Sequence, residues 1–182
     1  SAMKDYDDLW ADEWRINAEV IGPSEYHRLR LVEDLMKRYR LVGETILDAG
    51  CGSGNLLVRS KQKFEGASFT GLDVSSEALA VARQRVGSWA TLQVGDLEKS
   101  ESLPHEEYNV ILCSEVLEHI IENRIALDNL YNLCKPGGQV VIAVPHGPQY
   151  WTPHDDAAGH CRRYTRDEMR DKTQDAGFVV SE

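Results

Sequence analysis

Few cysteines, no long apolar segment and no surplus of positive charge set the first limits on this chain of 182 residues. Lys and Arg total 20 against 30 Asp and Glu, so the formal net charge is −10. A charge of this sign argues against a general nucleic-acid binder and against a protein of anionic membrane surfaces. The apolar runs are short, so we expect no segment to cross a bilayer.

The cysteines are widely spaced and form no C-x-x-C pair, which signals neither a disulfide framework nor a tetrahedral zinc site. They are Cys51, Cys113, Cys134 and Cys161. No charged and apolar leader opens the chain, so we expect a cytoplasmic protein. Apolar residues make up 42% of the chain, enough for the core of one globular domain.

Beyond Gly43, short apolar runs alternate with helical stretches. Nearly continuous apolar runs are typical of strands buried on both faces of a parallel sheet, and we expect strands at 45–47, 67–72, 90–94, 110–113 and 140–144. We expect helices from an N-cap at Ser24, over 55–63 and 75–86, around 127–134, and from a capping box at Thr165 to Gly177. This alternation predicts an α/β fold with a doubly wound, mostly parallel sheet.

The strongest local signal is a glycine-rich turn between the first expected strand and its helix. Its sequence over 48–54 is Asp-Ala-Gly-Cys-Gly-Ser-Gly. Alternating glycines let the backbone approach a ligand with no Cβ in the way, and the N–H groups of the helix then face that ligand. Asp73, which ends the second strand, can accept both hydroxyls of a ribose; the alternative is a structural turn with an N-capping aspartate. The spacing fits neither the triphosphate P-loop nor the dinucleotide fingerprint.

The turn resembles motif I of the class I S-adenosylmethionine-dependent methyltransferases. Further matches follow in the same order along the chain: Asp73, Gly-Asp-Leu at 95–97, the segment 110–119, Lys-Pro-Gly-Gly at 135–138 and Gly-His-Cys-Arg-Arg-Tyr-Thr at 159–165. The chain is similar in particular to the ubiquinone-pathway O-methyltransferases, and this resemblance implies a Rossmann-like fold. It also implies S-adenosylmethionine as methyl donor and S-adenosylhomocysteine as product.

The resemblance implies an arm and cap helix over residues 1–43 and a cofactor-binding methyltransferase domain over 44–182. Helix one and the arm, with Trp10 and Trp14, would act as a lid. Asp73 would bind the ribose, Asp96 the adenine amine, and Val74 and Leu97 would enclose the ring. The full set of implied cofactor contacts is Asp48, Gly50, Cys51, Gly52, Gly54, Asp73, Val74, Asp96, Leu97 and Ser114.

No Asn/Asp-Pro-Pro-aromatic sequence follows the fourth strand, so the chain departs from the amino-methylating DNA and protein-glutamine enzymes. A small-molecule acceptor with a hydroxyl or amine remains. His119 and His154 are the candidate catalytic residues, because a neutral histidine deprotonates a hydroxyl. His160 is interpreted as structural. A cofactor-binding module without turnover is the alternative from another class.

Glu115, Glu118 and His119 leave a metal site open. Their spacing would place them on one helix face, where a later histidine could complete a divalent-cation site. Similar spacing occurs in small-RNA 3′-end 2′-O-methyltransferases, but the net charge and the lack of a basic stripe argue against RNA. We therefore assign no metal ligand.

The end of the chain departs from the family pattern. Residues 177–180 are expected to begin a sixth strand, and the seventh is missing, so the C-terminal antiparallel hairpin is incomplete. An uncovered sheet edge favours association. We therefore expect a homodimer, a rearranged edge or a shortened form of a longer natural chain.

Overall fold

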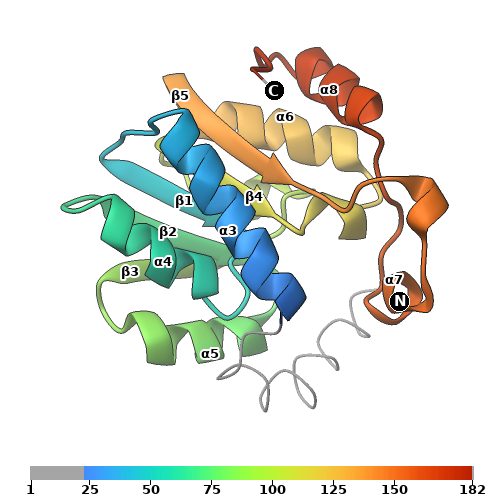
Figure 1. Ribbon diagram of the computed structural model, residues 1–182. Coiled ribbons are helices and arrows are strands. Elements are labelled where there is room, and N and C mark those ends of the chain that lie inside the picture. The colour runs from blue at the N-terminus through green and yellow to red at the C-terminus, as the bar shows by residue number, and fades with distance from the viewer. Residues whose placement is uncertain (1–22, 182) are drawn as a thin grey trace.

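The computed structural model describes residues 23–181, with side chains from His27 onward (Figure 1). Five strands form one parallel sheet in the order β3-β2-β1-β4-β5, which confirms the predicted doubly wound α/β fold. The strands are β1 (Thr45–Ala49), β2 (Ser68–Asp73), β3 (Ala90–Val94), β4 (Tyr108–Ser114) and β5 (Cys134–Ala143).

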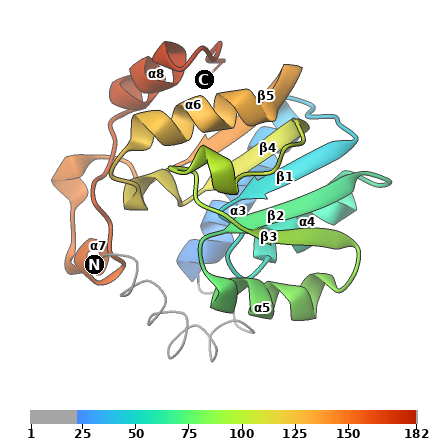
Figure 2. The ribbon, with the colours of Figure 1, turned by 180° about the vertical axis from the view of Figure 1, so that it is seen from behind.

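Helices cover both faces of this sheet (Figures 1 and 2). On one face lie α3 (Pro23–Arg38), α4 (Asn55–Lys63) and α5 (Ser76–Val86). On the other lie α6 (Asn123–Leu133) and α8 (Arg166–Asp175), while the short α7 (Pro153–Ala157) belongs to the long connection after β5. Three short 3₁₀ turns complete the described elements, at Ser100–Ser102, Leu117–His119 and Pro148–Tyr150.

The two faces of the sheet bury two separate apolar clusters. Successive strand residues point to opposite faces. Ile46 accordingly packs with Val32 and Met36 of α3, while its neighbour Leu47 packs with Leu127 of α6. This alternation explains the continuous apolar runs of the sequence, since every side chain of a central strand meets a helix layer.

Most predicted elements are found, with shifts at their ends. Ser24 lies inside α3, one residue after its start, and is not its cap; Trp10 and Trp14 lie outside the described residues. Ser75 caps α5 by accepting the N–H of Ala78, and Thr165 caps α8 by accepting the N–H of Glu168.

Two predictions near the end of the sheet are wrong. The Lys-Pro-Gly-Gly segment 135–138 does not separate a helix from a strand; it lies inside β5, where the pairing with β4 shifts register between Tyr108 and Val110. Residues 177–180 form no strand. Phe178 instead packs edge-to-face on Tyr131 and Val179 is 95% exposed. A strand requires a partner for its backbone, and among the described residues no strand pairs with this segment.

Candidate functional site

The loops after β1 and β4 lie side by side at the carboxyl edge of the sheet. From β1 the chain proceeds outward to β2 and β3, then crosses back to β4 on the other side of β1. In open α/β sheets, ligands bind in the crevice at such a reversal of strand order. Both the glycine turn and the segment after β4 are therefore placed where the fold forms a site.

The glycine turn is held tightly against its neighbours. Gly50 and Cys51 donate their N–H groups to the carbonyl of Leu72, at 2.7 and 2.9 Å. Gly50 has a φ of 90°, and a Cβ at this position would lie 2.2 Å from Cγ2 of Val116 in the loop after β4. Glycine is therefore required at position 50 both by conformation and by space.

Asp73 organises the turn from the end of β2. Its Oδ2 accepts the N–H of Gly52 at 2.8 Å and its Oδ1 accepts the N–H of Ser75 at 3.0 Å, at the start of α5. The alternative role of Asp73, an aspartate that fixes the turn and the start of the next helix, is thus present in the structure. The structural role and a role in ligand binding do not exclude each other, because a carboxylate oxygen can accept more than one hydrogen bond.

Asp48 is a buried acid without a donor. Its side chain is 2% exposed, and Oδ2 has no hydrogen-bond partner among the described residues. Burial, assisted by the charge of Asp73, raises the pKa of Asp48 to about 8. An unsatisfied carboxyl is costly in a protein interior. A donor group of a ligand beside the glycine turn would satisfy this oxygen.

The residues assigned to the adenine differ in accessibility. Val74 is 38% exposed beside the turn, whereas Leu97 is 5% exposed and belongs to the core cluster. The implied place of Leu97 beside the adenine ring stays a prediction. Asp96 is half-buried, with Oδ1 accepting the N–H of Glu98, and Ser114 is half-buried at the end of β4.

The loop after β4 is not the helix that the sequence suggested. Glu115 has a φ of 58°, and Leu117–His119 form a single 3₁₀ turn before α6 begins at Asn123. The expected i, i+3, i+4 face of Glu115, Glu118 and His119 is therefore wrong. Glu115 instead lies 3.9 Å from the Arg28 guanidinium of α3.

The structure brings His119 next to His160. Their rings lie 4.8 Å apart, edge to face. Burial, with a contribution from His160, lowers the pKa of His119 to about 4, so its ring is neutral but only weakly basic at neutral pH. His154 is exposed on α7.

The proximity of the two histidines follows from contacts between the segment 159–164 and the loop after β4. Cys161 donates its N–H to the carbonyl of Glu118 at 2.7 Å, and Arg162 Nη2 donates to the carbonyl of Ile121 at 2.9 Å. The interpretation of His160 as structural stays a prediction, but it did not include the contact of its ring with His119. The Gly-His-x-Arg-x-Tyr-Thr pattern was the available signal, but it does not indicate which loop the segment contacts.

Glu118, His119 and His160 form a group that fits a metal ion. Each offers one ligand atom, and these atoms lie within 4.8 Å of one another. Both carboxylate oxygens of Glu118 are buried without a hydrogen-bond partner among the described residues, and burial and the nearby Glu115 raise its pKa. Two imidazoles and a carboxylate suit Zn²⁺ and related divalent metals. Glu115, which the sequence included, is not in the group.

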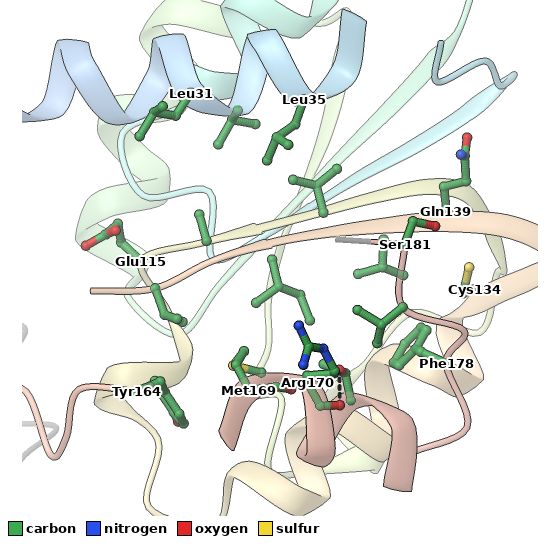
Figure 3. A pocket seen from close by; sticks show the side chains of 18 of the residues that line it. Leu31, Leu35, Glu115, Cys134, Gln139, Tyr164, Met169, Arg170, Phe178 and Ser181 are labelled. Carbon is green, nitrogen blue, oxygen red and sulfur yellow. Dashed lines mark hydrogen bonds between the residues drawn. The ribbon is translucent and has the colours of Figure 1, made fainter. Parts of the chain in front are cut away.

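A cavity of about 1630 Å³ runs along β5 between α3 and α8 (Figure 3). Leu31 and Leu35 line it from α3, Met169 from α8, and Glu115 marks the end near the loop after β4. His119, His154 and His160 also line it, whereas the glycine turn and Asp73 do not. The lining of the cavity therefore does not include the glycine turn.

The comparison with protein families decides the identity of the fold. Residues 24–182 match the model of a methyltransferase domain. The chain belongs to this family. The ubiquinone biosynthesis O-methyltransferase of Vibrio cholerae is 35% identical over 145 residues, which cover 78% of this chain and 58% of that protein. The chain thus spans less than two thirds of the length of this curated relative.

Solved structures of the same fold have diverged further in sequence. The N-methyltransferase NodS from Bradyrhizobium japonicum WM9, in complex with S-adenosyl-L-homocysteine, matches with a TM-score of 0.75 at 19% identity, over 96% of this chain and 85% of that one. The [4+2]-cyclase SpnF matches with a TM-score of 0.69 at 20% identity, over 85% of this chain and 59% of that one. Both comparisons establish the methyltransferase fold.

None of the helices in the described part of the chain has the length and apolar character that a bilayer crossing requires.

Proposed function

We propose that the chain binds S-adenosylmethionine at the glycine turn and transfers its methyl group to a hydroxyl of a small molecule held in the β5 cavity. The observation that carries this proposal is the glycine turn fixed by Asp73 beside the unpartnered Asp48 at the reversal of strand order. The names of the curated relative and of NodS support the donor and the reaction class.

The residues at the crevice match the parts of this donor. Asp73 at the end of β2 would accept the ribose hydroxyls, and Val74 offers an exposed apolar surface to the adenine. Asp96 lies at the same edge of the sheet, in the loop after β3. Asp48 supplies a buried acceptor for a donor group of the ligand. The remaining predicted cofactor contacts would come from the backbone of the two loops, at Gly50, Cys51, Gly52, Gly54 and Ser114. Leu97 would support the adenine side from the apolar core.

The methyl group of a sulfonium is already electrophilic, so the protein mainly has to place the acceptor in line with it. Orientation of this kind supplies a large part of the rate acceleration in two-substrate reactions. The cavity wall of α3 and α8 would hold the acceptor, and His119, His154 and His160 would contact its hydroxyl. The low basicity of His119 favours hydrogen bonding over proton abstraction by that residue.

Calorimetric titration with S-adenosylhomocysteine tests the donor site. We expect Asp73→Ala to weaken binding by roughly 1–3 kcal/mol, the cost of losing charged hydrogen bonds. Asp128→Ala is the matched control, because Asp128 lies on α6 in an exposed pair with Arg124. An unchanged affinity of Asp73→Ala would remove the ribose assignment, and no binding by the parent protein would overturn the proposal.

Turnover with a panel of phenols, catechols and amines separates an enzyme from a binding module. The described fold alone does not decide this, since SpnF shares it and is described as a cyclase. Methylation of a hydroxyl acceptor is the expected result. Methylation confined to amines would change the acceptor class, and binding without turnover would favour the module.

We also propose a cytoplasmic setting and self-association. The four cysteines are free thiols, as a reducing compartment would keep them. Among the described residues no strand pairs with the outer side of β5, and such an edge favours association of two copies. Sedimentation velocity over a range of concentrations should show a dimer; a monomer at every concentration would contradict this.

A further inference from the structure

Asp155 is a fully buried carboxylate in an otherwise exposed segment. Its side chain has 0% exposure, whereas Trp151, His154 and Asp156 nearby are exposed. It is enclosed by its own hydrogen-bond donors. A buried charge is tolerated only where its lone pairs are satisfied, so the arrangement around Asp155 is specific.

Five hydrogen bonds converge on this carboxylate. Arg163 binds both oxygens, from Nε to Oδ1 at 2.7 Å and from Nη2 to Oδ2 at 2.8 Å. The N–H and hydroxyl of Thr152 donate to Oδ2 at 2.8 and 3.0 Å. The fifth contact joins Oδ1 to Nδ1 of His160 at 2.8 Å.

The protonation of these groups fixes the state of the histidine ring. The Arg163 guanidinium donates to both oxygens of Asp155 and Thr152 donates twice to Oδ2, an arrangement that favours the ionised carboxylate. Asp155 is therefore ionised and accepts hydrogen bonds only. Nδ1 of His160 must consequently carry the hydrogen in this contact, which leaves Nε2 as the ring nitrogen with a free lone pair when the ring is neutral.

His160 is also fixed in position. Its side chain is 9% exposed, its N–H donates to the carbonyl of Asp155 at 2.9 Å, and its ring packs on that of His119. His160 lines the β5 cavity. A ring with one nitrogen committed to a carboxylate and with its plane fixed presents its other nitrogen in a single direction.

We propose that Asp155 is a positioning residue for the methyl transfer: it holds His160 in the Nδ1–H tautomer so that Nε2 accepts the hydrogen bond of the acceptor hydroxyl. Nε2 takes the hydroxyl proton as the acceptor oxygen bonds to the methyl carbon, and the electron pair of the broken sulfur–methyl bond leaves with S-adenosylhomocysteine. This inference rests on the proposed function for its second clause, whereas the tautomer itself is a property of the protein alone. In hydrolytic triads, an aspartate that orients a histidine acts in the same way, and replacement by asparagine yields the wrong tautomer.

Long-range ¹H–¹⁵N NMR of the ¹⁵N-histidine-labelled protein at pH 9 reports the tautomer directly, with His160 assigned from the His160→Gln variant. We expect Nδ1–H in the parent protein. In Asp155→Asn the amide can donate to Nδ1, so we expect Nε2–H. Thr152→Val is the matched structural control, because it removes one hydrogen bond to Asp155 without touching His160; we expect it to retain Nδ1–H.

Two measurements separate this inference from a failure of folding or of the proposed function. S-adenosylhomocysteine affinity should be the same in Asp155→Asn and in the parent protein. With catechol as acceptor probe, kcat of Asp155→Asn should fall at least tenfold while KM for S-adenosylmethionine is unchanged. An Nε2–H ring in the parent protein, or Nδ1–H in a folded Asp155→Asn variant, would overturn the inference. A parent protein that shows Nδ1–H but binds no S-adenosylhomocysteine would overturn the proposed function. The role of His160 toward the acceptor would then be lost, while the tautomer assignment would stand.

Discussion

The hydroxyl of Tyr164 donates a 2.9 Å hydrogen bond to the main-chain carbonyl of Leu117, in the loop after β4. Asn123 Nδ2 donates to the same hydroxyl at 3.1 Å, and both bonds are buried. Together with the Cys161–Glu118 backbone contact, they fix the segment that carries His160 against the loop that carries His119. One buried tyrosine thus connects two distant parts of the chain into one end of the site.

Tyr164→Phe should destabilise the protein by about 1–3 kcal/mol, because the Leu117 carbonyl and the Asn123 amide each lose a buried partner. For a domain of this size, that corresponds to a fall in Tm of roughly 2–4 °C per kcal/mol in thermal unfolding. Tyr131→Phe is the control, since Tyr131 is 46% exposed. Equal Tm values for both variants would show that the buried hydroxyl contributes nothing.

Gly50→Ala should abolish S-adenosylhomocysteine binding, because the added Cβ would lie 2.2 Å from Val116 and force the turn to move. Gly66→Ala is the matched control: Gly66 also has a positive φ, of 80°, but nothing lies within 4 Å of the position that its Cβ would take. Calorimetry should therefore show loss of binding for the first variant and retention for the second. Binding by Gly50→Ala with parent affinity would contradict the role of this turn.

Asp48→Asn should make the ligand-free protein more stable at pH 8. The pKa of Asp48 is raised from 3.8 to about 8 by folding, so the unfolded chain ionises first and folding loses free energy as the pH rises from about 4 to about 8. Asparagine does not ionise, so Asp48→Asn lacks this decrease in the free energy of unfolding. Denaturant unfolding at pH 5 and pH 8 should show a smaller pH-dependent decrease for Asp48→Asn. An identical decrease of the unfolding free energy in both proteins would mean that ionisation of Asp48 does not destabilise the fold.

In the protein without an acceptor, a divalent cation should bind at Glu118, His119 and His160, in competition with the acceptor hydroxyl for Nε2 of His160. Titration with Zn²⁺ should give a stoichiometric site in the parent protein and a large loss of affinity in His160→Ala, because one of three protein ligands is removed. His105→Ala is the control, since His105 is exposed outside this group. Equal Zn²⁺ affinity in the two variants would exclude the site. Removal of the metal with EDTA would then leave turnover unchanged as far as these residues are concerned.

The sequence predicted the elements that depend on local pattern. Strand β3 and helix α4 have the predicted bounds, because a continuous apolar run and a helix that starts after a glycine turn are determined by neighbouring residues. The turn at 48–54 and the end of β2 at Asp73 were likewise found, since glycine spacing is a local property. The helix expected after β4 was wrong, because the left-handed backbone of Glu115 and its bond to β5 interrupt it.

The α/β fold and the position of the turn that faces the proposed donor could be read from the residues alone, because both follow from periodicity and from residues close together in the chain. Three-dimensional packing was needed to show that His160 meets His119, that Asp155 is buried under Arg163, and that Asp48 and Glu118 lack donors. These features depend on contacts between segments far apart in the chain. No local pattern determines which segments meet, because that choice is made by the packing of the whole sheet and its helices.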